Sequence, residues 1–147
     1  MLKLILNKKY NPLFSSDARY FIITGGRGSG KSFAVTVFLT LLTMTKGIRI
    51  LFTRFTMTSA HLSIIPEFLE KIGLLGFDEV FSINKAEVVN TSNQSDILFR
   101  GIRTSAGNQT ASLKSLQGIS TWVLDEAEEL VDENIFDTID LSIREKN

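Results

Sequence analysis

The sequence predicts an α/β fold in which a mainly parallel sheet carries a phosphate-binding loop. Residues 20–24 (YFIIT) form a short apolar run that ends at a glycine-rich segment, and a helical pattern begins at Lys31. Residues 121–124 (TWVL) form a second apolar run, which ends at two acidic residues. Short apolar strands that alternate with helices are typical of parallel sheets with helices on their faces.

The remaining elements follow from apolar spacing and from turn residues. The helix from Lys31 should extend to Lys46 and stop at Gly47, and a strand over 48–55 would complete a parallel β-α-β crossover with residues 20–24. We also expect a helix from Thr58 or Ser59 to about Ile72, which Pro66 kinks or divides and Gly73 ends. Strands over 81–91 and 96–102 should form a small hairpin against the parallel core. A polar loop over 103–118 and a helix over 133–144, capped by Asp132, complete the prediction.

Length and composition indicate one domain. The 147 residues, of which 44% are hydrophobic and 22% charged, suffice to bury a core. The chain has no cysteine, which excludes disulfides and zinc–thiolate sites, and no apolar run reaches the roughly 18 residues of a membrane span. We therefore expect an intracellular protein that does not act in a membrane.

The charges are divided unevenly along the chain although the net charge is zero. Residues 1–118 hold 14 Lys and Arg against 7 Asp and Glu, whereas residues 119–147 hold 2 against 9. The basic part could attract a polyanion such as DNA, and the acidic part could hold a metal ion. An equally good explanation is that both parts are solvated surfaces.

The glycine-rich segment satisfies the phosphate-loop pattern G-x-x-x-x-G-K-[ST] between a predicted strand and a predicted helix. Its glycines allow successive backbone N–H groups to point at phosphates, and the start of the helix adds its positive dipole end. Lys31 would reach the β- and γ-phosphates of ATP, and the Ser32 hydroxyl would ligate Mg²⁺. The alternative, a glycine-rich surface turn, would need chance to supply all four fixed positions and both flanking elements. The predicted ATP-binding residues are Gly25, Gly26, Arg27, Gly28, Ser29, Gly30, Lys31 and Ser32.

The acid pair that follows residues 121–124 becomes a specific signal in combination with the glycine-rich loop. A strand parallel to the first would deliver Asp125 beside the phosphates to hold Mg²⁺, and Glu126 could polarise the attacking water. An apolar run that ends in an acid is otherwise most often a strand end in solvent. The predicted metal ligands are thus Ser32 and Asp125, and the predicted catalytic residues are Lys31, Glu126 and Arg27.

Other residues keep two interpretations. Arg27 could touch the γ-phosphate or be an exposed loop residue, and Arg54 could contact the nucleotide or form a structural ion pair. Basic residues beside the polar loop could meet DNA phosphates, but are more often solvated; these are Arg100, Arg103 and Lys114. Aromatic and proline residues before the first predicted strand could hold adenine or simply pack; these are Tyr10, Pro12 and Phe14.

These motifs together resemble the ATPase domain of the large terminase subunit of tailed bacteriophages, a DNA-packaging motor. The resemblance runs from about Arg19 to Arg144. It is carried by the loop GGRGSGKS with its arginine, by Arg54 at the end of the next strand, by SLKSLQG at 112–118, and by VLDEAEEL at 123–130.

The resemblance implies a RecA-like P-loop fold of the ASCE type, in which Arg27 responds to the γ-phosphate. It also implies a homo-oligomeric ring that acts in the host cell cytoplasm on double-stranded DNA, with a small terminase subunit and a portal. A nuclease domain would follow. In such folds a further strand inserts between the acid-bearing strand and the phosphate-loop strand; the chain ends at Asn147 before it. We therefore expect an N-terminal fragment.

Two other functions remain open at this point. A helicase or another DNA-stimulated ATPase would use the same loop and acids. A fragment that binds nucleotide, or that takes part in assembly without hydrolysis, would retain the motifs without turnover.

Overall fold

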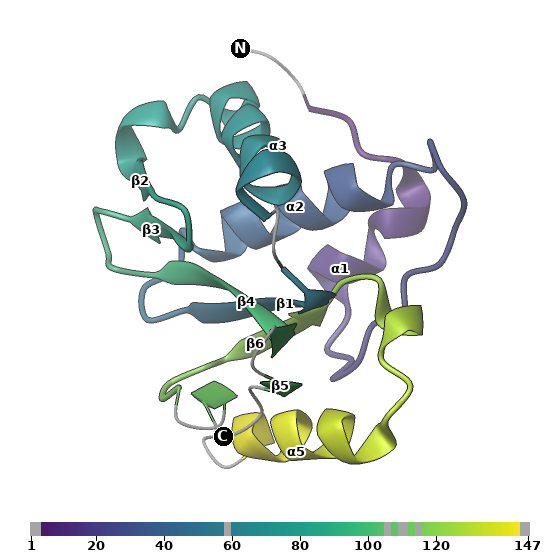
Figure 1. The fold of residues 1–147 in the computed structure, drawn as a ribbon. Coiled ribbons are helices and arrows are strands. Elements are labelled where there is room, and N and C mark those ends of the chain that lie inside the picture. Colours follow the sequence, from purple (N-terminus) through teal and green to yellow (C-terminus); the bar gives the residue numbers. More distant parts are fainter. Residues whose placement is uncertain (1–3, 58–59, 105–106, 109–111, 114–115, 145–147) are drawn as a thin grey trace.

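The computed structural model describes residues 4–57, 60–104, 107–108, 112–113 and 116–144. In this part of the chain, six strands form one sheet with the order β2-β3-β4-β1-β6, and β5 pairs with β4 off this path (Figure 1). The strands β1 (Arg49–Thr56), β4 (Asp96–Thr104) and β6 (Thr121–Leu124) are parallel, with β1 between the other two. Antiparallel pairing adds β2 (Phe81–Ile83), β3 (Glu87–Asn90) and β5 (Gly107–Asn108).

Helices cover both faces of this sheet. Figure 1 shows α2 (Lys31–Leu42) and α3 (Ala60–Leu75) on one face and α5 (Glu133–Arg144) on the other. Shorter elements complete the described fold: η1 (Lys8–Tyr10), α1 (Pro12–Ser15), η2 (Asp78–Val80) and η3 (Ala127–Glu129). No helix among the described residues combines the length and the apolar character that crossing a bilayer requires.

The core is divided by the sheet, because successive side chains of a strand point to opposite faces. Ile50 and Phe52 of β1 pack toward α2 and α3, whereas Leu51 packs toward α5. The first side contains three aromatic rings, from Phe52, Phe68 and Phe99, with centroids 5.3 to 5.9 Å apart. These packed layers are the α/β arrangement that the sequence predicts.

Several predicted elements are confirmed. Strands β1 and β6 lie within one residue of their predicted bounds, and α5 occupies the predicted range. Asp132 caps α5, since its Oδ1 accepts a hydrogen bond from the Asn134 amide at 3.0 Å. Helix α2 begins at Lys31 as predicted and ends at Leu42, four residues earlier than the expected Lys46.

The predicted strand at residues 20–24 is wrong. This segment pairs with no described strand, and Ile22 is 91% exposed. Strand β6 pairs with β1 alone, and no described strand lies between β6 and the segment. An extended run without a neighbour has no partner for its backbone groups, so its apolar sequence cannot by itself make it a strand. The predicted crossover between residues 20–24 and 48–55 is therefore also absent.

The predicted hairpin is only partly correct. Strand β4 does pair antiparallel with β3, but it also pairs parallel with β1 along most of its length, so it belongs to the parallel core. Ile97 and Leu98 are both almost fully buried, although they point to opposite faces, as expected for a central strand. The predicted strand over 81–91 is divided by a turn in which Asn84 Oδ1 accepts the amides of Ala86 and Glu87.

Helix α3 continues beyond its predicted end. It passes through Pro66, and Gly73 lies inside it. The stop is Gly76, which adopts a left-handed φ of 73°, while the amides of Gly76 and Phe77 donate to the carbonyls of Gly73 and Ile72. These paired bonds form a glycine-based helix cap, which explains why the later glycine ends the helix. The expected cap residues Thr58 and Ser59 lie outside the described residues.

Candidate functional site

The glycine-rich segment folds as a tight loop that leads into α2. Gly25 and Gly30 have φ values of 149° and 79°, which other residues rarely adopt. A side chain at Gly25 would also approach Ser29 Oγ to 3.0 Å. The Ser29 amide closes a turn by donating to the Gly26 carbonyl at 3.3 Å. Glycine at these positions therefore permits a compact loop beneath the start of the helix.

The first amides of α2 are available to a ligand. The Ala34 amide makes the first bond into the helix, to the Gly30 carbonyl at 3.0 Å, and no side chain caps this end. Within the described residues, four preceding amides have no hydrogen-bond acceptor: those of Gly30, Lys31, Ser32 and Phe33. Unpaired amides at the start of a helix form a favourable site for an anion such as phosphate.

The side chains around this loop suit the same ligand. The Lys31 ammonium donates to the carbonyls of Gly25 and Gly26, so its charge lies over the loop. Ser29 Oγ is buried and has no hydrogen-bond partner in the described part of the chain. Ser32 and Arg27 are exposed, and neither side chain forms a hydrogen bond or ion pair with the described residues. The loop thus combines a cation, free donors and an unpaired hydroxyl.

The acid pair follows β6 and is held by β1. The Asp125 amide donates to the Thr53 carbonyl at 2.9 Å, which extends the pairing of β6 with β1. Arg54 donates to Asp125 Oδ2 through Nε at 2.9 Å and through a terminal nitrogen at 2.6 Å. Its Nε also lies 3.4 Å from Glu126 Oε2. One guanidinium therefore forms ion pairs with both predicted acids, and of the two interpretations of Arg54 the contacts show the structural ion pair.

Glu126 has an unusual backbone conformation. Its φ of 52° and ψ of 49° lie in the left-handed region, which is uncommon for a residue with a side chain. Glu126 directly follows the last paired residues of β6 and directly precedes η3, so it lies in the turn that ends the strand. Such a strained position at the end of a strand is frequent in functional sites.

Glu67 of α3 borders the acid pair. Burial raises the pKa of its carboxyl group; Lys71 and Arg54 oppose this rise, and Asp125 and Glu70 add to it. The helix that covers one face of the sheet thus brings a third carboxyl group into the electrostatic field of the predicted metal ligand. Nothing in the sequence pattern pointed to Glu67, because its neighbours come from a strand and a loop that are distant in sequence.

The segment before the loop is attached to α5 by side chains instead of strand pairing. The Tyr20 hydroxyl lies 3.1 and 3.0 Å from the two carboxylate oxygens of Asp140, to which it can donate. Arg19 lies 4.0 Å from the same carboxylate. Asp140 is only 7% exposed whereas Tyr20 is 50% exposed, so water is excluded from the attachment on the α5 side and reaches it on the other.

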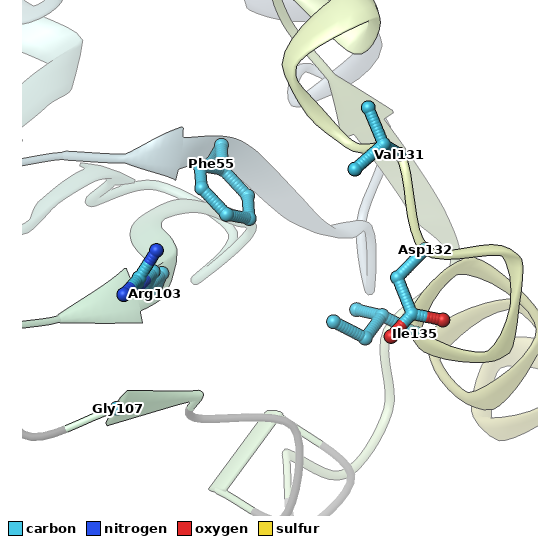
Figure 2. A pocket seen from close by; sticks show the side chains of 6 residues that line it. All are labelled: Phe55, Arg103, Gly107, Val131, Asp132 and Ile135. Carbon is cyan, nitrogen blue, oxygen red and sulfur yellow. The ribbon is translucent and has the colours of Figure 1, made fainter.

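A hollow of about 350 Å³ lies between the ends of β1 and β4 and the start of α5 (Figure 2). None of the predicted ATP or metal ligands lines it. Arg103 lies over the Phe55 ring at 6.0 Å, and Asp132 faces the hollow from the start of α5. Of the other basic residues proposed for DNA, Arg100 donates to the carbonyls of Ala86 and Phe99, and Lys114 lies outside the described residues.

The predicted residues therefore form two groups at one edge of the sheet. Figure 1 shows the start of α2 on the side toward which the arrows of β1 and β6 point. No hydrogen bond or ion pair between described residues joins the loop to the acid pair. Within the described residues no group of three or more acids or histidines lies close enough to hold a metal ion. The Asp125 carboxylate and the Ser32 hydroxyl are oxygen donors, the kind of ligand that Mg²⁺ takes from proteins together with phosphates.

These features define the class of protein: an α/β protein with a RecA-like parallel core, helices on both faces and a glycine loop at the start of a helix. The chain matches the family model of the phage terminase large subunit over residues 17–147, and it belongs to that family. The family acts in phage DNA packaging, and its members are generally ATPases. A search of curated proteins found no match.

Proposed function

We propose that this chain provides the site at which a phage DNA-packaging motor binds and hydrolyses ATP. The observation that supports this most is the start of α2, where four unpaired amides and the Lys31 ammonium surround one glycine loop. The acid pair at the ends of β6 and β1 lies at the same edge of the sheet. Ligands of open α/β sheets bind at this edge.

In this proposal the loop residues bind the phosphates. Amides of Gly30 to Phe33 and the Lys31 ammonium would stabilise negative charge on the β- and γ-phosphates as it develops during transfer. On ATP binding, Lys31 exchanges the carbonyls of Gly25 and Gly26 for phosphate oxygens. The exposed Arg27 is within the loop and would contact the γ-phosphate.

The acid pair supplies the remaining functions. Ser32 and Asp125 would hold Mg²⁺, which when bound neutralises phosphate charge. Glu126 would orient the attacking water and accept its proton. Because Arg54 occupies Asp125 Oδ2, it must move or share this carboxylate before a metal ion can use that oxygen.

We propose that the work done by hydrolysis is translocation of double-stranded DNA into the procapsid. The partners of this reaction would be further copies of the chain in a ring, a small terminase subunit and a portal. Membership of the terminase family supports DNA packaging over a helicase task.

Phosphate release from ATP tests the enzymatic part of this proposal. We expect Mg-dependent turnover by the full chain, stimulated by DNA, and a loss of at least 100-fold in Glu126→Gln, because general-base catalysis commonly contributes about 10²- to 10⁴-fold. The exposed Glu128→Gln is the matched control and should retain turnover. ATP binding without turnover in the unmodified chain would instead favour a non-hydrolysing nucleotide-binding role.

A further inference from the structure

We propose that Tyr10 is a positioning residue for the glycine loop. By donating a hydrogen bond to the Ser29 carbonyl, it fixes the Ser29–Gly30 peptide and directs the Gly30 amide toward bound phosphate. This inference rests on the proposed ATP site, and it adds a residue that the phosphate-loop pattern does not contain.

The contact is well defined. The Tyr10 hydroxyl lies 2.8 Å from the Ser29 carbonyl oxygen, although the two residues are 19 positions apart. The ring is only 6% exposed and packs with Leu13 and with Ala34 of α2. Its edge lies near Gly30 as well, since a side chain there would come within 3.9 Å of Tyr10 Cε2. A buried ring cannot stack on adenine, so the structure favours packing and loop support for Tyr10.

Peptide geometry connects this contact to the ligand site. A trans peptide is planar, and its C=O and N–H bonds point in opposite directions. When Tyr10 holds the Ser29 carbonyl on its own side, the Gly30 N–H must point away from Tyr10. This amide is one of the four without a described acceptor, and it directly precedes the first residue of α2.

The loop has few other restraints at this peptide. Gly30 has no side chain to restrict its rotation, and its φ of 79° is easily exchanged for other values. The adjacent Ser29 amide makes only a 3.3 Å bond within the loop, and the Ser29 hydroxyl is unpaired. The Tyr10 hydroxyl is therefore the side-chain donor that selects one orientation before the ligand arrives. Selection in advance reduces the entropy cost of binding.

The test compares ADP and pyrophosphate binding by calorimetry in the full chain and in Tyr10→Phe, well below both melting temperatures. We expect Tyr10→Phe to lower the affinity for ADP and for pyrophosphate by the same factor, about 3- to 10-fold. This factor corresponds to the loss of one net hydrogen bond. Tyr20→Phe is the matched control, because it removes a hydroxyl that bonds to Asp140 on α5. It should lower the melting temperature without changing either affinity.

Each result has a separate meaning. If the unmodified chain binds neither ligand, the proposed ATP site fails. If it binds both and folded Tyr10→Phe binds them equally well, the role of Tyr10 is overturned. Should Tyr10→Phe not fold, nitrogen-15 NMR of the unmodified chain decides: pyrophosphate should shift the Gly30 amide together with those of Lys31 and Ser32. A Gly30 amide that stays unshifted while the others move contradicts the inference.

Discussion

Arg54 is the residue whose position has the clearest chemical consequence. It lies between two carboxylates, and its shortest contact is 2.6 Å, to Asp125 Oδ2. A metal ion that binds Asp125 must compete with this guanidinium. We therefore expect Arg54→Gln to tighten the binding of Mn²⁺, a paramagnetic substitute for Mg²⁺, in the presence of ADP by about 3- to 10-fold, as measured by electron paramagnetic resonance.

The matched control is Arg49→Gln. Arg49 also forms an ion pair with an aspartate, Asp96, at 3.0 Å, but at the opposite end of β1. The pair also raises the pKa of the Arg49 guanidinium, mainly through its hydrogen bond to Asp96. This variant should lose up to about 1 kcal/mol of stability and keep its metal affinity. Weaker metal binding in Arg54→Gln would contradict the competition between Arg54 and the metal ion for Asp125. It would indicate that Arg54 contacts the bound nucleotide.

Glu67 gives a prediction about pH. Its folded-state pKa is raised chiefly by burial, so the fold favours the protonated carboxyl relative to the unfolded chain. The stability from this preference is complete below the ordinary glutamate pKa of about 4.3 and is lost as the pH rises through the folded-state value. Glu67→Gln should therefore raise the melting temperature at pH 7 and have little effect at pH 4.

Thermal melts between pH 4 and pH 7 measure this difference. The exposed Glu79→Gln serves as the control and should show no comparable trend. A Glu67→Gln variant that is less stable at pH 7 would show that the ionised carboxylate stabilises the fold, contrary to the direction of the shift.

Single residues were predictable where a motif fixes the spacing. The order G-x-x-x-x-G-K-S brings Lys31 and Ser32 to the start of α2, because the loop and the helix are contiguous in sequence. The partners of Asp125 and of Ser29 were not predictable. They are Arg54 and Tyr10, which lie 71 and 19 positions away, so only the packing of separate elements brings them together.

At the scale of the elements, the segment over 20–24 is attached to a helix that is distant in sequence. Asp140 of α5 holds it through the Tyr20 hydroxyl and is almost fully buried. Asp140→Ala leaves that hydroxyl without this acceptor, which should cost about 1 to 3 kcal/mol of unfolding free energy. Hydrogen exchange of the amides over 20–24 should become faster.

Asp137→Ala provides the comparison for this variant, because Asp137 is an exposed residue one turn earlier in the same helix. Its unfolding free energy and its exchange rates should remain close to those of the unmodified chain. Equal effects of the two substitutions would show that charge on α5, and not the attachment to Tyr20, determines the result.

The same segment shows where element prediction fails. Residues 20–24 and 121–124 are both short apolar runs, yet only the second is a strand. The local residue types favour an extended backbone. A strand also needs a neighbouring strand with which its backbone groups form hydrogen bonds. The run over 121–124 has β1 beside it, and the run over 20–24 has no described strand beside it.

At the scale of the whole molecule, the layers explain how two distant motifs reach one edge. Parallel pairing of β1, β4 and β6 places their carboxyl ends together, and α2 starts on that side (Figure 1). The α/β class and the family follow from the motifs, since the family model covers residues 17–147. The central position of β4 did not follow, because the hairpin pattern is the same at the edge of a sheet and in its middle.

The measurement that tests the proposed site most directly is calorimetric binding of ATP, in the presence of Mg²⁺, to the full chain and to Lys31→Ala. The Lys31 ammonium donates to the carbonyls of the loop and would donate to the phosphates of bound ATP. Hydrogen bonds between charged groups are among the stronger ones, so their loss should be measurable. We predict binding by the unmodified chain and a loss of at least 10-fold in Lys31→Ala, with Lys46→Ala, exposed beyond the end of α2, unchanged. Equal affinity of Lys31→Ala and the unmodified chain would contradict the assignment of the glycine loop as the ATP site.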